Sequence, residues 1–187
     1  MKTIIAEVSA RHIHLSQKDL EKLFGKNHQL KKLKDLSQPH QFATNETLTV
    51  KGEHGIFPKV RIIGPIRSKT QVELSITDCY SLGIKPSIQV SGQVKSASQV
   101  VLKGPKGQVV VSAIVAMRHL HLSEKQAKVW KYKHGKKISV LIKGERSVIL
   151  NNVVVRVGDF NTRLQLDTDE GNAVGLVNNQ KVYIYEK

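Results

Sequence analysis

Residues 11–16 read Arg-His-Ile-His-Leu-Ser, and residues 118–123 read Arg-His-Leu-His-Leu-Ser. This phrase contains four of the eight histidines of the chain, arranged as two His-x-His pairs. In a β-strand, residues i and i+2 point to the same face, so each pair would present two imidazoles to one side. A six-residue phrase that occurs twice indicates an internal duplication, and therefore a chain built from two similar units.

The repeat extends on both sides of the phrase. Largely apolar, strand-like stretches precede it, at residues 5–10 in the first copy and 112–117 in the second. The serine that closes the phrase is followed three residues later by Asp or Gln, which is the spacing of a capping box at a helix start. We expect Gly25 and Gly135 to end these two short helices.

A second pair of segments also matches. Residues 70–84 align without gaps to residues 162–176, and each segment begins as an alternating, polar strand. The alignment places Glu73 of the first copy opposite Gln165 of the second. Each copy therefore consists of a lead-in strand, a His-x-His pair, a helix, further strands and a closing strand.

Short segments rich in Val and Ile fill the rest of the chain, and turns such as the Gly-containing residues 104–107 separate them. Many short strands with few helices predict a mainly β protein with short α-helices, made of two tandem, structurally similar small β-barrels. We expect the first domain to span residues 1–90 and the second residues 91–187, with a boundary in 86–98. Exchange of strands between the two domains stays open. The expected strands are 47–51, 59–63, 87–90, 99–102, 109–111, 138–142, 153–157 and 182–185.

Composition narrows the class of partner. The net charge of +15 will attract polyanions, which leaves nucleic acid, an anionic membrane surface or a small substrate with several phosphates. Aromatic residues make up only 5% of the chain, which argues against extensive base-stacking platforms. The chain contains no run of 18 apolar residues, so the sequence predicts no membrane-spanning helix. The single cysteine, Cys79, is expected to be a small core residue in a protein of a reducing compartment, rather than a nucleophile.

The His-x-His pairs are the main candidates for chemistry. Neutral imidazole binds zinc, copper, nickel or iron, and a catalytic zinc usually has three protein ligands and an open position. Glu73 is therefore the expected third ligand beside His12 and His14. Gln165 takes that place beside His119 and His121.

Two further groups of residues remain open at this point. Asp167, Asp169 and Glu170 form an acidic cluster that suits either a cation or, as we favour, a helix cap. Arg67 precedes Glu73 by six residues, and it is either a two-pronged phosphate ligand or an ordinary surface arginine.

Segments along nearly the whole chain resemble the PduL type of phosphate propanoyltransferase (phosphotransacylase) family, in the order of that family. They are Val-Ser-Ala-Arg-His-Ile-His-Leu-Ser at 8–16, Leu-Ser-Gln-Pro at 36–39, Gln-Phe-Ala at 41–43, Gly-Pro-Ile-Arg at 64–67 with Thr-Gln-Val-Glu at 70–73, Gly-Pro-Lys-Gly at 104–107, Arg-His-Leu-His at 118–121 and Asp-Thr-Asp-Glu-Gly-Asn-Ala at 167–173.

The resemblance implies two β-barrel domains and an enzyme that moves an acyl group between coenzyme A and inorganic phosphate, using two zinc ions. By the family pattern, one zinc is bound by the ligands already named, His12, His14 and Glu73. His119 and His121 bind the other zinc, with a third histidine where this chain has Gln165. Because an amide oxygen is a weaker zinc donor than imidazole, we expect one firm zinc site and a second metal that is loosely held, replaced by another ion or absent. Arg67 binds phosphate, and Tyr80 lines the coenzyme A site.

The expected partners are thus acyl-CoA and inorganic phosphate, with no specific nucleic acid and no membrane, and a homo-oligomer is left open. Some members of the family carry an amphipathic N-terminal segment that targets them to bacterial microcompartments. In this chain the strand-like segment 3–8 begins at once, so a cytoplasmic location is expected.

Two other functions stay open beside the enzyme. A degenerate paralogue that binds metal or coenzyme A with little turnover is favoured by Gln165. A nucleic-acid-binding protein is suggested by net charge alone, and it would bind with a strong dependence on salt.

Overall fold

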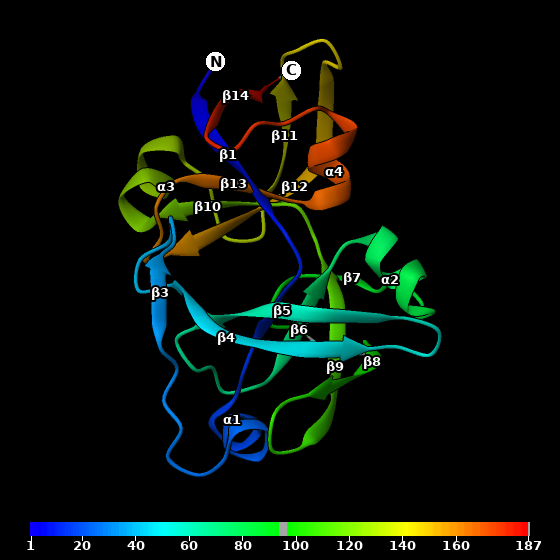
Figure 1. Cartoon of the computed structure of the whole chain (residues 1–187). Helices are drawn as coiled ribbons and strands as arrows, with labels where there is room; N and C mark the ends of the chain where they lie inside the picture. The colour runs from blue at the N-terminus through cyan, green and yellow to red at the C-terminus, as the bar shows by residue number, and fades with distance from the viewer. Residues whose placement is uncertain (94–96, 187) are drawn as a thin grey trace. The chain divides into compact units, whose positions relative to one another are not determined.

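The computed structural model describes residues 1–93 and 97–186, which form a mainly β protein with short helices, as predicted (Figure 1). The helices are α1 (Gln17–Phe24), α2 (Ile76–Leu82), α3 (Glu124–Trp130) and α4 (Thr168–Ala173). The strands are β1 (Thr3–Ser9), β2 (His12–His14), β3 (Lys32–Asp35), β4 (Phe42–Lys51), β5 (Ile56–Gly64), β6 (Gln71–Leu74), β7 (Ile88–Gln89), β8 (Ser98–Lys103), β9 (Gln108–Ala116), β10 (His119–Ser123), β11 (Lys137–Ile142), β12 (Val148–Gly158), β13 (Arg163–Asp167) and β14 (Gln180–Tyr185).

Two compact units contain one closed six-stranded barrel each, which confirms the predicted pair of barrels. Residues 11–116 form the first-motif barrel, with the strand order β4-β5-β2-β6-β9-β8 and closure through the pairing of β8 with β4. Residues 1–10 and 117–187 form the second-motif barrel, with the order β1-β13-β10-β12-β11-β14.

The division of the chain differs from the predicted domains 1–90 and 91–187, because each lead-in strand belongs to the other barrel. Strand β1, blue in Figure 1, pairs in parallel with β13 and antiparallel with β14. Strand β9 makes the equivalent parallel pairing with β6. The predicted boundary region 86–98 also contains residues 94–96, which lie outside the described residues.

Packing in the two barrel cores explains why each copy of the repeated phrase contains a β-strand. Successive side chains of a strand point to opposite faces, so the residues that alternate with the histidines face the barrel interior. Ile13 and Leu15 are at most 1% exposed in the first-motif barrel, and Leu120 and Leu122 are 0% exposed in the second. These apolar side chains anchor the phrase in each core and direct the histidines to the opposite face.

The helix starts are confirmed, because the closing serine of each phrase accepts a hydrogen bond from the backbone N–H three residues later. Gly25 caps α1 as predicted. The prediction for the second copy is wrong, since α3 ends at Trp130 and not at Gly135. The physical reason is Lys131, which adopts a left-handed conformation with φ of 55° and closes the helix. No helix in the described part of the chain has the length and apolar character to cross a membrane.

The exchange of lead-in strands predicts which fragments fold. Residues 11–116 should fold alone, because they contain every strand of the first-motif barrel, whereas residues 1–90 lack β8 and β9. Thermal melting followed by far-ultraviolet circular dichroism should show a cooperative transition for residues 11–116 and none for residues 1–90. A cooperative transition of residues 1–90 would contradict the exchange.

Candidate functional site

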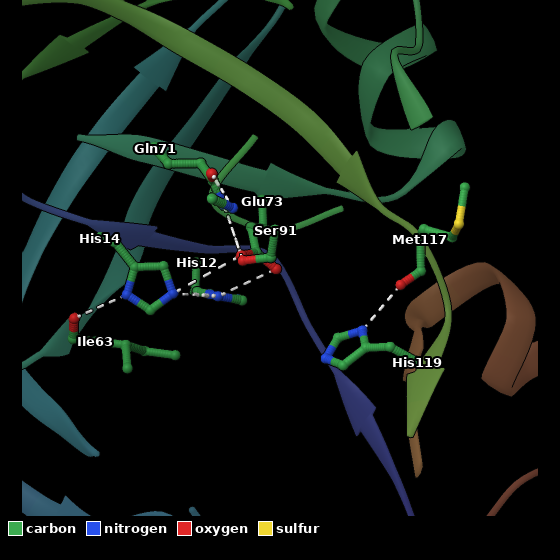
Figure 2. A network of polar contacts seen from close by, with 9 residues as sticks. His12, His14, Ile63, Gln71, Glu73, Ser91, Met117 and His119 are labelled. Atoms are coloured by element: carbon green, nitrogen blue, oxygen red, sulfur yellow. Dashed lines mark hydrogen bonds and ion pairs between the residues drawn. The ribbon is translucent and has the colours of Figure 1, made fainter. Parts of the chain in front are cut away.

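The first His-x-His pair meets a carboxylate on the neighbouring strand. In the antiparallel pairing of β2 with β6, His12 lies opposite Glu73. Figure 2 shows the side chains of His12, His14 and Glu73 converging, and their potential ligand atoms all lie within 4.8 Å of one another. His12 Nε2 is 3.6 Å from Glu73 Oε2, and His14 Nε2 is 3.9 Å from Glu73 Oε1.

The spacing of the two imidazoles suits a shared ion. The Nε2 atoms of His12 and His14 are 3.1 Å apart. Two imidazole ligands of a tetrahedral zinc, at Zn–N of about 2.0–2.1 Å, have nitrogens about 3.3 Å apart. All three residues are at most 8% exposed, so they are largely shielded from solvent.

His14 is held as a neutral imidazole. Its Nδ1 lies 3.2 Å from the backbone oxygen of Ile63, a partner to which Nδ1–H can donate, so that the lone pair of Nε2 faces the site. Burial lowers the pKa of His14 well below its usual value, and the charges of His12 and Arg67 lower it further, against the opposing charge of Glu73. Neutral imidazole is the form that binds a metal.

Two residues that the sequence did not reveal orient Glu73. Gln71 Nε2 donates to Glu73 Oε1 over 2.7 Å, and Ser91 Oγ donates to the same oxygen over 2.6 Å. The contact of Gln71 with Glu73 could have been predicted from the sequence, since Gln71 lies two residues before Glu73 and therefore on the same face of β6. The contact of Ser91 with Glu73 could not have been predicted, because Ser91 lies in a turn 18 residues away.

The arginine of the phrase also has a structural role that the sequence did not reveal. Arg11 Nε donates to Asp78 Oδ1 over 3.0 Å, and Asp78 lies in the first turn of α2, just after the strand of Glu73. In the second copy, Arg118 Nε donates to Glu170 Oε1 over 2.5 Å, and Glu170 lies in the first turn of α4. The repeated ion pair ties each His strand to the end of its closing strand.

The other predicted site residues of this unit lie as follows. Arg67 is half-buried, its backbone N–H bonds to the oxygen of Leu15 over 2.8 Å, and its charge acts on His14. Tyr80 lies on α2 and is 70% exposed. Their roles toward phosphate and coenzyme A stay predictions. Cys79 is 2% exposed within the core cluster, which confirms its prediction as a core residue.

The second His-x-His pair has a similar backbone and a different third residue. In the pairing of β10 with β13, His119 lies opposite Gln165, which confirms the alignment of Gln165 with Glu73. The rings of His119 and His121 have centroids 4.6 Å apart. His119 Nδ1 lies 2.9 Å from the backbone oxygen of Met117, which again leaves Nε2 as the ligand atom (Figure 2).

The donor chemistry distinguishes the two pairs. Gln165 Nε2 donates to Glu7 Oε2 over 2.7 Å, and Arg163 Nε donates to Glu7 Oε1 over 3.0 Å. The amide of Gln165 is thus engaged with a carboxylate that an arginine already neutralises. Among residues 1–93 and 97–186, the one group of three His, Cys, Asp or Glu with metal-ligand spacing is His12, His14 and Glu73. The first pair fits zinc, and among the residues that the structure describes no Asp, Glu, Cys or further His completes such a group with the second pair.

Comparison with known proteins decides the family. A family model described as phosphate propanoyltransferase matches residues 5–177. A phosphate propanoyltransferase of Thermotoga maritima is 41% identical over 98% of this chain and 89% of its own length. Those of Enterococcus faecalis and Priestia megaterium are 41% and 44% identical, over 97% and 94% of this chain and 88% and 82% of their own lengths. The chain belongs to the phosphate propanoyltransferase family.

Membership of this family agrees with the resemblance seen in the sequence.

The acidic cluster of Asp167, Asp169 and Glu170 forms a helix cap, because Asp167 is the N-cap of α4 and accepts a hydrogen bond from the backbone N–H of Glu170 over 2.8 Å. Desolvation by burial raises the pKa of Asp167 and of Glu170. Residues 104–107 likewise form the predicted turn, with a bond from the N–H of Gly104 to the oxygen of Gly107 over 2.9 Å.

Metal content tests the asymmetry between the two pairs. Protein dialysed against zinc should retain about one ion per chain, because only the first pair has a carboxylate as third ligand. Glu73→Gln should retain almost none, since it gives the first pair the donor types of the second. Gln165→His should raise the content above that of wild type. Inductively coupled plasma mass spectrometry measures all three, and equal content in wild type and Glu73→Gln would refute the assignment.

Proposed function

We propose that the protein transfers a short acyl group, propanoyl or acetyl, between coenzyme A and inorganic phosphate, with zinc at the first His pair. The observation that carries the proposal is the buried group of His12, His14 and Glu73 in a chain of the phosphate propanoyltransferase family. Relatives that share about two fifths of their residues with this chain bear that name, and they align over nearly its whole length.

His12, His14 and Glu73 would hold the zinc, and Ser91 would help to hold Glu73 in place. A zinc bound there would act as a Lewis acid toward the thioester carbonyl or the departing thiolate. Three protein ligands leave one tetrahedral position open for a reactant.

Arg67 is the proposed phosphate ligand. A guanidinium donates two parallel hydrogen bonds to phosphate oxygens and stays charged at any physiological pH. Its charge reaches His14, so phosphate bound to Arg67 would lie near the proposed metal ligands. Positive charge at this point offsets the repulsion between phosphate and an anionic coenzyme A thioester.

The proposed step is a direct transfer. An oxygen of hydrogen phosphate attacks the carbonyl carbon, a C–O bond forms, the C–S bond breaks, and the phosphate proton ends on the coenzyme A sulfur. A protein acyl carrier is not needed, and the one cysteine, Cys79, is packed in a core.

The proposal includes a cytoplasmic location, which rests on this single thiol and hence on a chain without internal disulfides.

Thiol release tests the proposed reaction. Purified, zinc-loaded protein should release coenzyme A from propanoyl-CoA only when inorganic phosphate is present, and a chelator should stop the release. The measurement is absorbance of a thiol reagent, with sulfate at equal ionic strength as the control. No phosphate-dependent release from zinc-loaded protein would favour the alternative, a paralogue that binds metal or coenzyme A with little turnover.

Replacement of Arg67 tests its role. Arg67→Gln should lower kcat/KM for phosphate about tenfold to a hundredfold, because a charge-assisted hydrogen bond contributes about 1.5–3 kcal/mol. Arg67→Lys keeps the charge but cannot donate two parallel hydrogen bonds to phosphate. Its kcat/KM for phosphate should therefore lie between the values of wild type and Arg67→Gln. Steady-state kinetics with varied phosphate measures both variants. An unchanged kcat/KM for phosphate in Arg67→Gln would contradict the assignment.

A further inference from the structure

The two His pairs differ in the cross-strand neighbours of their second histidine. His14 lies opposite Gln71 of β6 and bonds to the backbone oxygen of Ile63 on β5, and the arginine in register with the first pair, Arg61, lies opposite His12 instead. In the second-motif barrel, His121 lies opposite Arg163 of β13 on one side and opposite Arg156 of β12 on the other. An arginine therefore stands on each side of the second pair.

We call Arg156, His121 and Arg163 the arginine row. Residues that pair directly across strands point to the same face, with Cβ atoms about 4.5–5.5 Å apart. The interior of this barrel is occupied by the alternate residues of the same strands, Leu120 and Leu164, which are both 0% exposed. The arginine row thus lies together on the outer face, where both arginines are half-buried.

Aromatic contacts order the arginine row. The ring of Phe160 stacks on His121 with centroids 4.3 Å apart and an interplanar angle of 23°. The guanidinium carbon of Arg156 lies 5.9 Å from the centroid of the same ring. One aromatic side chain therefore contacts both the histidine and one of the arginines, which limits the conformations that they adopt.

The charge of the arginine row opposes a cation. Glu7 accepts from Arg163 Nε and offsets part of its charge. Arg163 Nη1 donates to the backbone oxygen of Thr162 over 2.9 Å. A divalent metal at His121 would lie beside two guanidinium groups, whereas an anion there gains charge-assisted hydrogen bonds.

We propose that the arginine row is a binding site for a phosphate group and not a second metal site. Arginine donates in a planar fork that matches phosphate oxygens, and partial burial strengthens the interaction relative to bulk water. Inorganic phosphate and the phosphates of coenzyme A share this chemistry. The inference rests on the proposed function, whose substrates carry these phosphates, and binding is measured separately from turnover.

Binding of three probes to zinc-loaded protein tests the proposal by isothermal titration calorimetry: inorganic phosphate, coenzyme A and 3′-dephospho-coenzyme A. Arg156→Gln should weaken at least one of them about tenfold, through loss of a charge-assisted hydrogen bond. Arg146→Gln, an exposed arginine of the same unit, is the matched control and should bind all three as wild type does. Zinc content should be equal in all proteins.

Each outcome assigns or removes the site. Weaker binding of inorganic phosphate alone assigns free phosphate to the arginine row. Weaker binding of coenzyme A but not of its dephospho form assigns the 3′-phosphate, and weaker binding of both assigns the pyrophosphate. Unchanged affinity for all three overturns the proposal. Arg156→Met, which keeps an unbranched apolar stem beside Phe160, takes the place of Arg156→Gln if the latter does not fold cooperatively.

Discussion

The cross-strand register between each His strand and its closing strand is the constraint on which the site depends. It places His12 opposite Glu73 in one barrel and His119 opposite Gln165 in the other. A shift of one residue would turn the histidines into the core and the leucines outward, so the register is fixed by burial of the alternate residues. The grouping of His12, His14 and Glu73 on which the proposed metal chemistry rests is therefore a consequence of how the apolar side chains pack.

Exchange of the lead-in strands gives the two barrels different neighbours at the same place. Strand β9 brings Ile114 beside Glu73, whereas β1 brings Glu7 beside Gln165. The second-motif barrel thus has its carboxylate one strand further from the His pair, where Arg163 and Gln165 engage it. The two copies share a strand arrangement, and a few side chains distinguish the proposed cation site of the first pair from the arginine-flanked second pair.

Much of this arrangement follows from the sequence, because a gapless duplication with a period-two pattern fixes which residues are equivalent. The barrels, the helix starts and the correspondence of Glu73 with Gln165 were predictable in this way. The exchange was not, since Glu7 and Gln165 are 158 residues apart and either barrel can accept either apolar lead-in strand. Lys131 escaped prediction because lysine rarely adopts the left-handed conformation that ends α3.

The central claim is that the two His pairs, although equal in sequence, differ in the ion that they bind. Anomalous diffraction from crystals grown with zinc, collected on both sides of the zinc absorption edge, tests it most directly. The account predicts a peak among His12, His14 and Glu73 and none at His119 and His121. Peaks of equal height at both pairs, or a peak at the second pair alone, would contradict it.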